Sequence, residues 1–292
     1  MSDFQLSVVL ALTAAFVFAI GAHFTRFGLR TINAQSGAFI SISAATMLYW
    51  LAAPWQLAAA MFSSTAIWWF ILAGLFRPAF SSTFAMAGTS ILGPTISTTL
   101  SGTAPFFGLL AGVFLLEETF SLQGAVGTAA MVAGIMLLAR RGNESQGINW
   151  PLWALILPVM AAVIRVGASL VTKIGLEEIP SPYFAGLVAY NASLMIAVAN
   201  LVRRRVSVTT LFANPDSRWF MLSGIAFGGA IYLVNVALKL GPLSVVAPLV
   251  SLEGVFVLIL GITVFREQAL TWRIAFAVLL VALGAAAISA RG

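Results

Sequence analysis

Three charged residues lie where the sequence is otherwise apolar: Arg77, Arg165 and Glu253. Arg77 stands in the run FILAGLFRPAFSS and Arg165 in PVMAAVIRVGAS, while Glu253 is the only charge between Lys239 and Arg266. A guanidinium group presents a planar fork that fits a carboxylate or a phosphate. A carboxylate in apolar surroundings holds an ammonium group or carries a proton. The three residues predict either a binding site for a small charged or zwitterionic molecule or a buried structural ion pair.

The composition places these residues in a membrane protein. Of the 292 residues, 61% are hydrophobic and 8% are charged, whereas a soluble domain has about 25% charged residues. Long apolar runs with charges bunched between them indicate helices and not a β-barrel. The absence of cysteine and the single histidine exclude a disulfide framework, a thiolate nucleophile and a multi-histidine metal site. We therefore expect no metal and no cofactor.

Apolar runs long enough to cross a bilayer occur ten times, since about 20 helical residues span the hydrocarbon core. The links between them are short, which makes sequence neighbours antiparallel neighbours in space. The predicted spans cover residues 5–29, 35–54, 66–87, 94–116, 121–139, 151–173, 182–201, 218–240, 242–265 and 269–290.

The two halves of the chain repeat short motifs in the same order. The odd number of spans per half means that the second half enters the membrane from the opposite side, an architecture found in secondary transporters. We predict an all-α membrane protein of two inverted five-helix repeats, residues 1–145 and 146–292, around a central cavity. The matched motifs are TRFGL (25–29) with TKIGL (172–176), LGP (92–94) with LGP (240–242), EETFS (117–121) with EQALT (267–271), and Arg-Gly at 141–142 with Arg-Gly at 291–292.

The chain resembles the drug/metabolite transporter superfamily, in its EamA-type branch of ten helices. The resemblance covers nearly the whole chain and is carried by the LGP openings of spans 4 and 9, the links FLLEETFSLQG and VFREQALTW, and the glycine-rich spans 5 and 10. It implies a cavity lined by spans 1, 3, 4, 6, 8 and 9, with spans 5 and 10 at the periphery. Family members export amino acids, nucleosides, sugars, drugs and other metabolites, so the resemblance defines no substrate. Many relatives have a tryptophan in the middle of the first span, where this chain reads AAFVFAIGAHF, so aromatic amino acid export is not singled out.

Depth in the membrane relates the three charges to one another. Each lies near the midpoint of its span, where a charge facing lipid costs about 2.5–3.5 kcal/mol on insertion scales. We therefore expect all three to face the interior at a similar depth. The face of span 6 that carries Arg165 is small and partly polar, with Pro158, Ala161, Ala162, Ser169 and Thr172.

Two further residues are candidates for the site. Asn235 in span 8 is expected to reach the cavity as a substrate ligand. His23, near one end of span 1, is interpreted as a capping or interfacial residue, with a proton relay as the alternative. The sequence thus gives Arg77, Arg165, Glu253 and Asn235 as substrate-binding candidates, and Glu253 and His23 as proton-coupling candidates.

The positive charge gives an orientation signal. Most arginines fall in the loops after odd-numbered spans, which the positive-inside rule places in the cytoplasm with both termini outside. Family members usually have both termini inside, so two orientations stay open. Because the net charge of +6 sits in short loops, it indicates a lipid bilayer as partner and not a nucleic acid.

These observations predict a secondary transporter in the bacterial inner membrane, a monomer or homodimer. It would export small polar metabolites, with amino acids as the leading class, by alternating access and with a proton gradient as the driver. An exchanger or exporter of anionic metabolites is the alternative within transport. A membrane-embedded structural protein or enzyme is the alternative of another class, although the sequence has no HExxH motif and no nucleophile–base pair. The chain is therefore not expected to be an enzyme.

Overall fold

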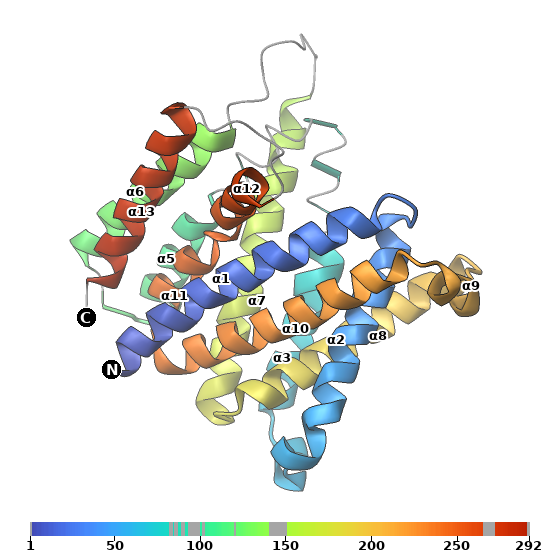
Figure 1. Ribbon diagram of the computed structural model, residues 1–292. Coiled ribbons are helices and arrows are strands. Elements are labelled where there is room, and N and C mark those ends of the chain that lie inside the picture. Colours follow the sequence, from blue (N-terminus) through green and yellow to red (C-terminus); the bar gives the residue numbers. More distant parts are fainter. Residues whose placement is uncertain are drawn as a thin grey trace.

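The computed structural model describes most of the chain. The residues described are 2–81, 84, 87–88, 91–92, 100, 103–119, 121–139, 151–264 and 272–290. Within these ranges the regular elements are all helices (Figure 1). Residues Gly93 and Pro94 of the first LGP motif, the EQALT motif and both Arg-Gly pairs lie outside the described residues.

Helices long and apolar enough to span a membrane account for six of the predicted spans. Three of them begin at side-chain caps: Ser2 forms a capping box with Gln5, and Asn33 and Ser181 each accept a hydrogen bond from a backbone N–H three residues on. The first five are α1 (Asp3–Gly28), α2 (Ala34–Gln56), α7 (Ile156–Glu178, preceded by the 3₁₀ turn Leu152–Leu155), α8 (Pro182–Arg203) and α10 (Ser217–Leu240).

Shorter helical segments occupy the other predicted spans. Span 3 contains α3 (Ala66–Gly74), which continues into a π-helix, η2 (Leu75–Phe80), around Arg77. Spans 4, 5 and 10 contain α5 (Ala104–Leu115), α6 (Leu122–Ala139) and α13 (Trp272–Ser289). The 3₁₀ helix η1 (Ala59–Ser63) and α9 (Val208–Ala213) lie in connections.

Span 9 differs from the prediction of one continuous helix over 242–265. It divides into α11 (Leu243–Val250) and α12 (Glu253–Thr263), separated by a turn at Ser251 and Leu252. The amide N–H of Ser251 donates hydrogen bonds to the carbonyls of both Ala247 and Pro248, and the amide N–H of Leu252 donates to the carbonyl of Leu249. The backbone therefore tightens here into turns closed by bonds between residues three apart. Glu253 is consequently the first residue of a half-helix.

The helix contacts show how the bundle is assembled. In the interior, α1 packs on α10, α3 on α7, α2 on α8 and α5 on α11. Helices α6 and α13 pack on each other and stand together at the edge of the bundle (Figure 1). This places the described parts of spans 5 and 10 at the periphery, as the family resemblance implies.

Close packing of α10 on α2 depends on a glycine. A Cβ atom added at Gly224 would collide with the backbone carbonyl oxygen of Ser41, whose hydroxyl also donates to the carbonyl of Phe220 at 2.9 Å. Gly224→Ala should lower the free energy of unfolding by about 1–3 kcal/mol, the usual cost of overpacking a tight interface. The melting temperature of the purified protein, followed by tryptophan fluorescence, measures this.

Gly229 provides the matched control on the same helix. A Cβ atom there meets nothing within 4 Å, and alanine is a better helix former than glycine by about 1 kcal/mol. Gly229→Ala should leave the melting temperature unchanged or raise it. Equal losses from both substitutions would contradict the packing argument.

Candidate transport site

The bundle encloses a cavity of about 430 Å³. Arg77, Arg165, Glu253 and Asn235 all lie on its wall, so the structure brings together four of the five residues selected from the sequence. Its lining residues come from α1 (Phe18), α2 (Ser41, Ile42), α3 and the segment after it (Ala73, Gly74, Arg77, Ser81), α5 (Ala104), α7 (Arg165, Val166, Ser169, Thr172), α8 (Ala185, Ala189, Tyr190, Ser193), α10 (Phe227, Ile231, Val234, Asn235) and span 9 (Val246, Ala247, Val250, Ser251, Glu253).

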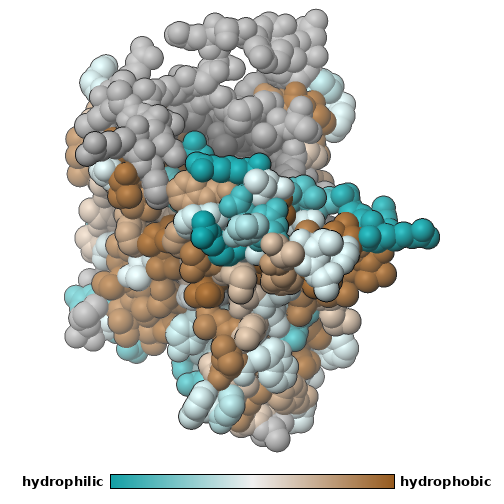
Figure 2. Space-filling view, turned by 45° about the vertical axis from the view of Figure 1, so that its right-hand side comes forward, coloured by the Kyte–Doolittle hydropathy of each residue, from teal (hydrophilic) through white to brown (hydrophobic). Residues whose placement is uncertain are grey.

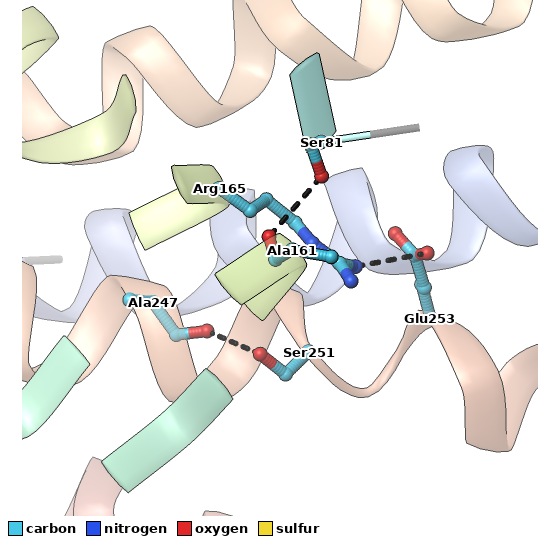
Figure 3. A network of polar contacts seen from close by, with 6 residues as sticks. All are labelled: Ser81, Ala161, Arg165, Ala247, Ser251 and Glu253. Carbon is cyan, nitrogen blue, oxygen red and sulfur yellow. Dashed lines mark hydrogen bonds and ion pairs between the residues drawn. The ribbon is translucent and has the colours of Figure 1, made fainter. Parts of the chain in front are cut away.

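Arg165 and Glu253 face each other across the cavity, from α7 and from the first residue of α12 (Figure 3). Their closest atoms, Nη1 and Oε1, are 3.7 Å apart, which is longer than a charge-assisted hydrogen bond of about 2.7–2.9 Å. The two side chains keep 38% and 37% of their surface exposed. The Nε atom of Arg165 is buried and has no acceptor among the described residues. The pair is therefore loose, open to the cavity and incompletely bonded.

Arg77 has a neutral partner. Its Nη2 atom donates to the hydroxyl oxygen of Ser169 on α7 at 2.6 Å. Within the described ranges no carboxylate forms an ion pair with Arg77. The π-helix around Arg77 widens the backbone turn at this point of span 3. Arg77 thus presents a guanidinium whose charge is not neutralised by a described side chain.

The face of α7 predicted to be interior is buried. Pro158, Ala161, Ala162, Ser169 and Thr172 all lie inside the bundle. The hydroxyl of Ser81 donates to the carbonyl of Ala161 at 3.2 Å, one turn before Arg165, and so joins span 3 to α7 (Figure 3).

Comparisons with known proteins agree with this architecture. Residues 5–140 match the EamA-like transporter family. An uncharacterized transporter in the cobO 3′ region of Sinorhizobium sp is 32% identical over 122 residues, which are 41% of this chain and 82% of the relative. The chain belongs to the EamA-like transporter family.

The EamA-like chain is therefore a multi-pass membrane protein and a transporter of the drug/metabolite transporter type. A solved crystal structure superposes on it with a TM-score of 0.79, covering 96% of this chain and 95% of the other at 17% identity. At this identity the match shows the shared fold and nothing of the substrate. The bacterial source of the curated relative agrees with the predicted inner membrane.

The remaining candidates occupy different positions in the transporter. Asn235 is buried on α10, and its carboxamide donates to the carbonyl of Pro182 at 3.1 Å, which fixes the residue at the cavity wall. His23 is not on the wall. It is buried, with Nε2 3.1 Å from the carbonyl of Val257 on α12. His23 contacts the half-helix one turn beyond Glu253.

The wall also differs from the lining implied by the family resemblance. Spans 2 and 7 contribute to it, through Ser41 and Ile42 and through four residues of α8 that include Tyr190. Phenylalanine, valine and isoleucine side chains separate the polar groups. The sequence did not single out Tyr190 as a cavity residue, because periodicity does not reveal which side of a buried helix meets a cavity.

Sequence reasoning missed a set of polar contacts at Glu118 and Lys173, on the side of the termini, which we call the polar seal. Glu118, after α5, accepts hydrogen bonds from the backbone amides of Leu243 at 2.5 Å and Ser244 at 2.8 Å, the first residues of α11. Its carboxylate therefore caps α11 where the helix dipole favours negative charge. A Cβ atom at Gly112 would lie 2.8 Å from the Ser244 amide, so glycine is needed for this approach.

Lys173 completes the seal from α7. Its Nζ atom donates to the carbonyls of Leu238 at 3.0 Å and Gly241 at 2.7 Å, at the end of α10. These contacts lie just beyond Thr172 and Asn235 of the wall, toward the side of the termini. The EET motif at 117–119 and the GP link at 241–242 were visible in the sequence, but nothing there indicated that they meet.

Proposed function

We propose that this EamA-like transporter is a secondary active exporter of small polar metabolites, with amino acids as the leading class. One observation carries the proposal: two guanidinium groups and one carboxylate from three different spans lie on the wall of one cavity. Charges at membrane depth are costly and mark substrate and ion pathways. The cavity of about 430 Å³ falls within the roughly 300–1,000 Å³ of small-molecule sites.

The arrangement of charges suits a zwitterion. Arg77, which has no carboxylate partner among the described residues, offers its charge to a substrate carboxylate. Glu253 lies 3.7 Å from Arg165 and offers its carboxylate to a substrate ammonium group. An incoming amino acid would bring both complementary groups and replace the loose Arg165–Glu253 contact with shorter ones. A small molecule that carries both charges would therefore be bound by Arg77 through its carboxylate and by Glu253 through its ammonium group.

The transport cycle follows from two inverted repeats, residues 1–145 and 146–292, that rock around the site. The helix contacts support this, because they occur in the pairs that exchange under repeat symmetry: α1 on α10 corresponds to α3 on α7, and α2 on α10 to α3 on α8. Spans related by the symmetry pack on each other, as α2 does on α8 and α6 on α13. The broken span 9 supports it further, since discontinuous helices form the substrate sites of many such transporters.

Glu253 is the proposed proton carrier. It lies at the start of α12 and faces Arg165 at 3.7 Å, so a substrate that competes for Arg165 would change the partner of this carboxylate. His23 bonds the carbonyl of Val257 in the same half-helix and would respond to movement of α12. Protonation of Glu253 would remove its attraction for Arg165. Proton uptake would therefore be linked to the step of the transport cycle in which no substrate is bound.

An exporter or exchanger of anionic metabolites is the second candidate. It is favoured by the excess of cations, because Arg77 and Arg165 together outnumber the carboxylate of Glu253 on the described wall. A dicarboxylate or a phosphate ester would then bridge the two guanidinium groups. The same experiment separates the two candidates.

The test is a thermal-shift screen of amino acids, organic acids and phosphate esters on the purified protein and on Glu253→Gln. A ligand that binds the folded state raises the melting temperature by mass action. We expect an amino acid to raise it in the unaltered chain, and the shift to disappear in Glu253→Gln. Asp3→Asn, which removes an exposed carboxylate of the first turn of α1, is the control and should keep the shift.

An anionic metabolite that stabilises both proteins equally would favour the second candidate. An amino acid that stabilises Glu253→Gln as strongly as the unaltered chain would contradict the proposed role of Glu253.

A further inference from the structure

Arginine residues gather at the end of the bundle where α1 and α8 end and α10 begins. Ile32, Leu201 and Phe220 share one buried cluster, so these helix ends meet. The only carboxylate near them in the described chain is Asp216, which accepts a hydrogen bond from Thr31 at 2.7 Å. The segments at these helix ends carry six exposed arginines: Arg26, Arg30, Arg203, Arg204, Arg205 and Arg218.

Two of these arginines are held on aromatic rings. The guanidinium carbon of Arg30 lies 5.3 Å from the ring centroid of Phe27, and that of Arg218 lies 5.2 Å from the ring of Trp219. The rings of Phe27 and Trp219 are themselves 5.2 Å apart. The four side chains form a ladder, Arg30–Phe27–Trp219–Arg218, across the ends of α1 and α10.

The ladder leaves the hydrogen-bond donors of Arg30 and Arg218 at the surface, since both residues are exposed. A guanidinium group packed on a ring is held by its face, and its N–H groups point away in the plane of the group. Neither Arg30 nor Arg218 has an ion pair with a carboxylate of the described residues. Two exposed guanidinium groups with no carboxylate partner in the described part of the chain fit phosphate oxygens, which they bind through paired N–H donors.

The surroundings indicate where such a phosphate comes from. Phe24 stacks on Trp219 at 5.9 Å, and Leu29 is exposed beside Arg30, so apolar side chains adjoin the charged groups. Figure 2 turns this end of the bundle forward and shows hydrophilic side chains gathered over a hydrophobic surface. Aromatic residues beside basic ones at the end of a membrane-spanning helix are typical of the headgroup layer.

We propose that the Arg30–Phe27–Trp219–Arg218 ladder is a binding site for the phosphate headgroup of an anionic phospholipid. The acyl chains of this lipid lie along the apolar surfaces of α1 and α10. The site is separate from the transport cavity, and it does not depend on the proposed substrate or on proton coupling. It also assigns the loops after odd-numbered spans to the leaflet that carries the bound anionic lipid.

Native mass spectrometry of the detergent-purified protein tests this with phosphatidylglycerol and phosphatidylcholine of identical acyl chains. We expect the unaltered chain to retain phosphatidylglycerol several-fold more than phosphatidylcholine. Arg30→Gln/Arg218→Gln should remove most of that difference. Arg30→Lys/Arg218→Lys keeps the charge without the planar fork and should retain an intermediate amount, and this variant serves if the glutamine variant does not fold.

The matched control is Arg203→Gln/Arg204→Gln, which removes the same charge from the same end of the bundle without touching the ladder. It should retain phosphatidylglycerol as the unaltered chain does. Equal losses in the control and the ladder variant would overturn the proposal, since general attraction would then explain binding. Equal retention of the two lipids by the unaltered chain would also overturn it. Stabilisation of the protein by soluble glycerol phosphate that is as great as its stabilisation by phosphatidylglycerol would overturn it as well.

Discussion

Replacing Arg77 by glutamine should weaken substrate binding by about 30-fold or more while the protein stays folded. Arg77 is the cation of the cavity whose described contact is to a neutral hydroxyl, that of Ser169, so its charge is available to a substrate anion. Loss of one partner of a buried, hydrogen-bonded charge pair costs about 2–5 kcal/mol. This corresponds to a loss of affinity of about 30-fold or more. Titration calorimetry with the metabolite found in the thermal-shift screen measures it.

Conservative and remote variants make this result interpretable. Arg77→Lys keeps the charge but loses the planar fork, so we expect an affinity between those of the unaltered protein and Arg77→Gln. Lys239→Gln removes an exposed positive charge near the end of α10 and should bind as the unaltered chain does. If Arg77→Gln binds with unchanged affinity, Arg77 is a structural residue and the zwitterion site is wrong.

The sequence predicted helix positions well where apolar length decides them. Predicted span 5–29 is α1 (Asp3–Gly28), and predicted span 218–240 is α10 (Ser217–Leu240). Hydropathy did not reveal the turn at Ser251 and Leu252, because a broken span and a continuous one have the same apolar composition. The break lies where tertiary contacts hold α11, including Ala247 against Gly108 on α5.

Depth arguments brought the right residues to the cavity but did not give their partners. The cost of a charge at mid-membrane placed Arg77, Arg165 and Glu253 inside the bundle. Arg165 faces Glu253, and Arg77 donates a hydrogen bond to Ser169, because of the rotation and tilt of the helices that carry them. Neither the rotation nor the tilt of a helix can be read from the sequence. The same holds for His23, since its place near the end of a span did not reveal that it meets the carbonyl of Val257 on α12.

The seal at Glu118 was missed because its charges look like ordinary loop charges. Glu118 stands at the end of a span, where carboxylates are common. Its function in the fold depends on the amides of Leu243 and Ser244, which are 125 and 126 residues away in sequence. Backbone groups carry no sequence signature, so only the three-dimensional arrangement reveals this contact.

Glu118→Gln should open the cavity toward the side of the termini. The carboxylate accepts two backbone N–H groups at the start of α11, whereas the amide of glutamine offers one acceptor oxygen and turns a donor toward the second N–H. Hydrogen bonds to a charged group contribute about 1.5–3 kcal/mol. Their loss should shift the equilibrium between the closed and open forms by about 10- to 100-fold. Under the proposed alternating-access cycle, this shift appears as a change in which face admits solvent.

The cysteine-free sequence makes the measurement direct. A single cysteine at Val250, on the cavity wall, is alkylated by a membrane-impermeant thiol reagent applied to either side of sealed vesicles. The rate from the terminal side should rise in Glu118→Gln and fall from the opposite side. Glu117→Gln removes the same charge from the adjacent, exposed residue and should leave both rates unchanged. Identical rates in all three proteins would mean that Glu118 caps α11 in every state of the transporter and that this end of the cavity is not a gate.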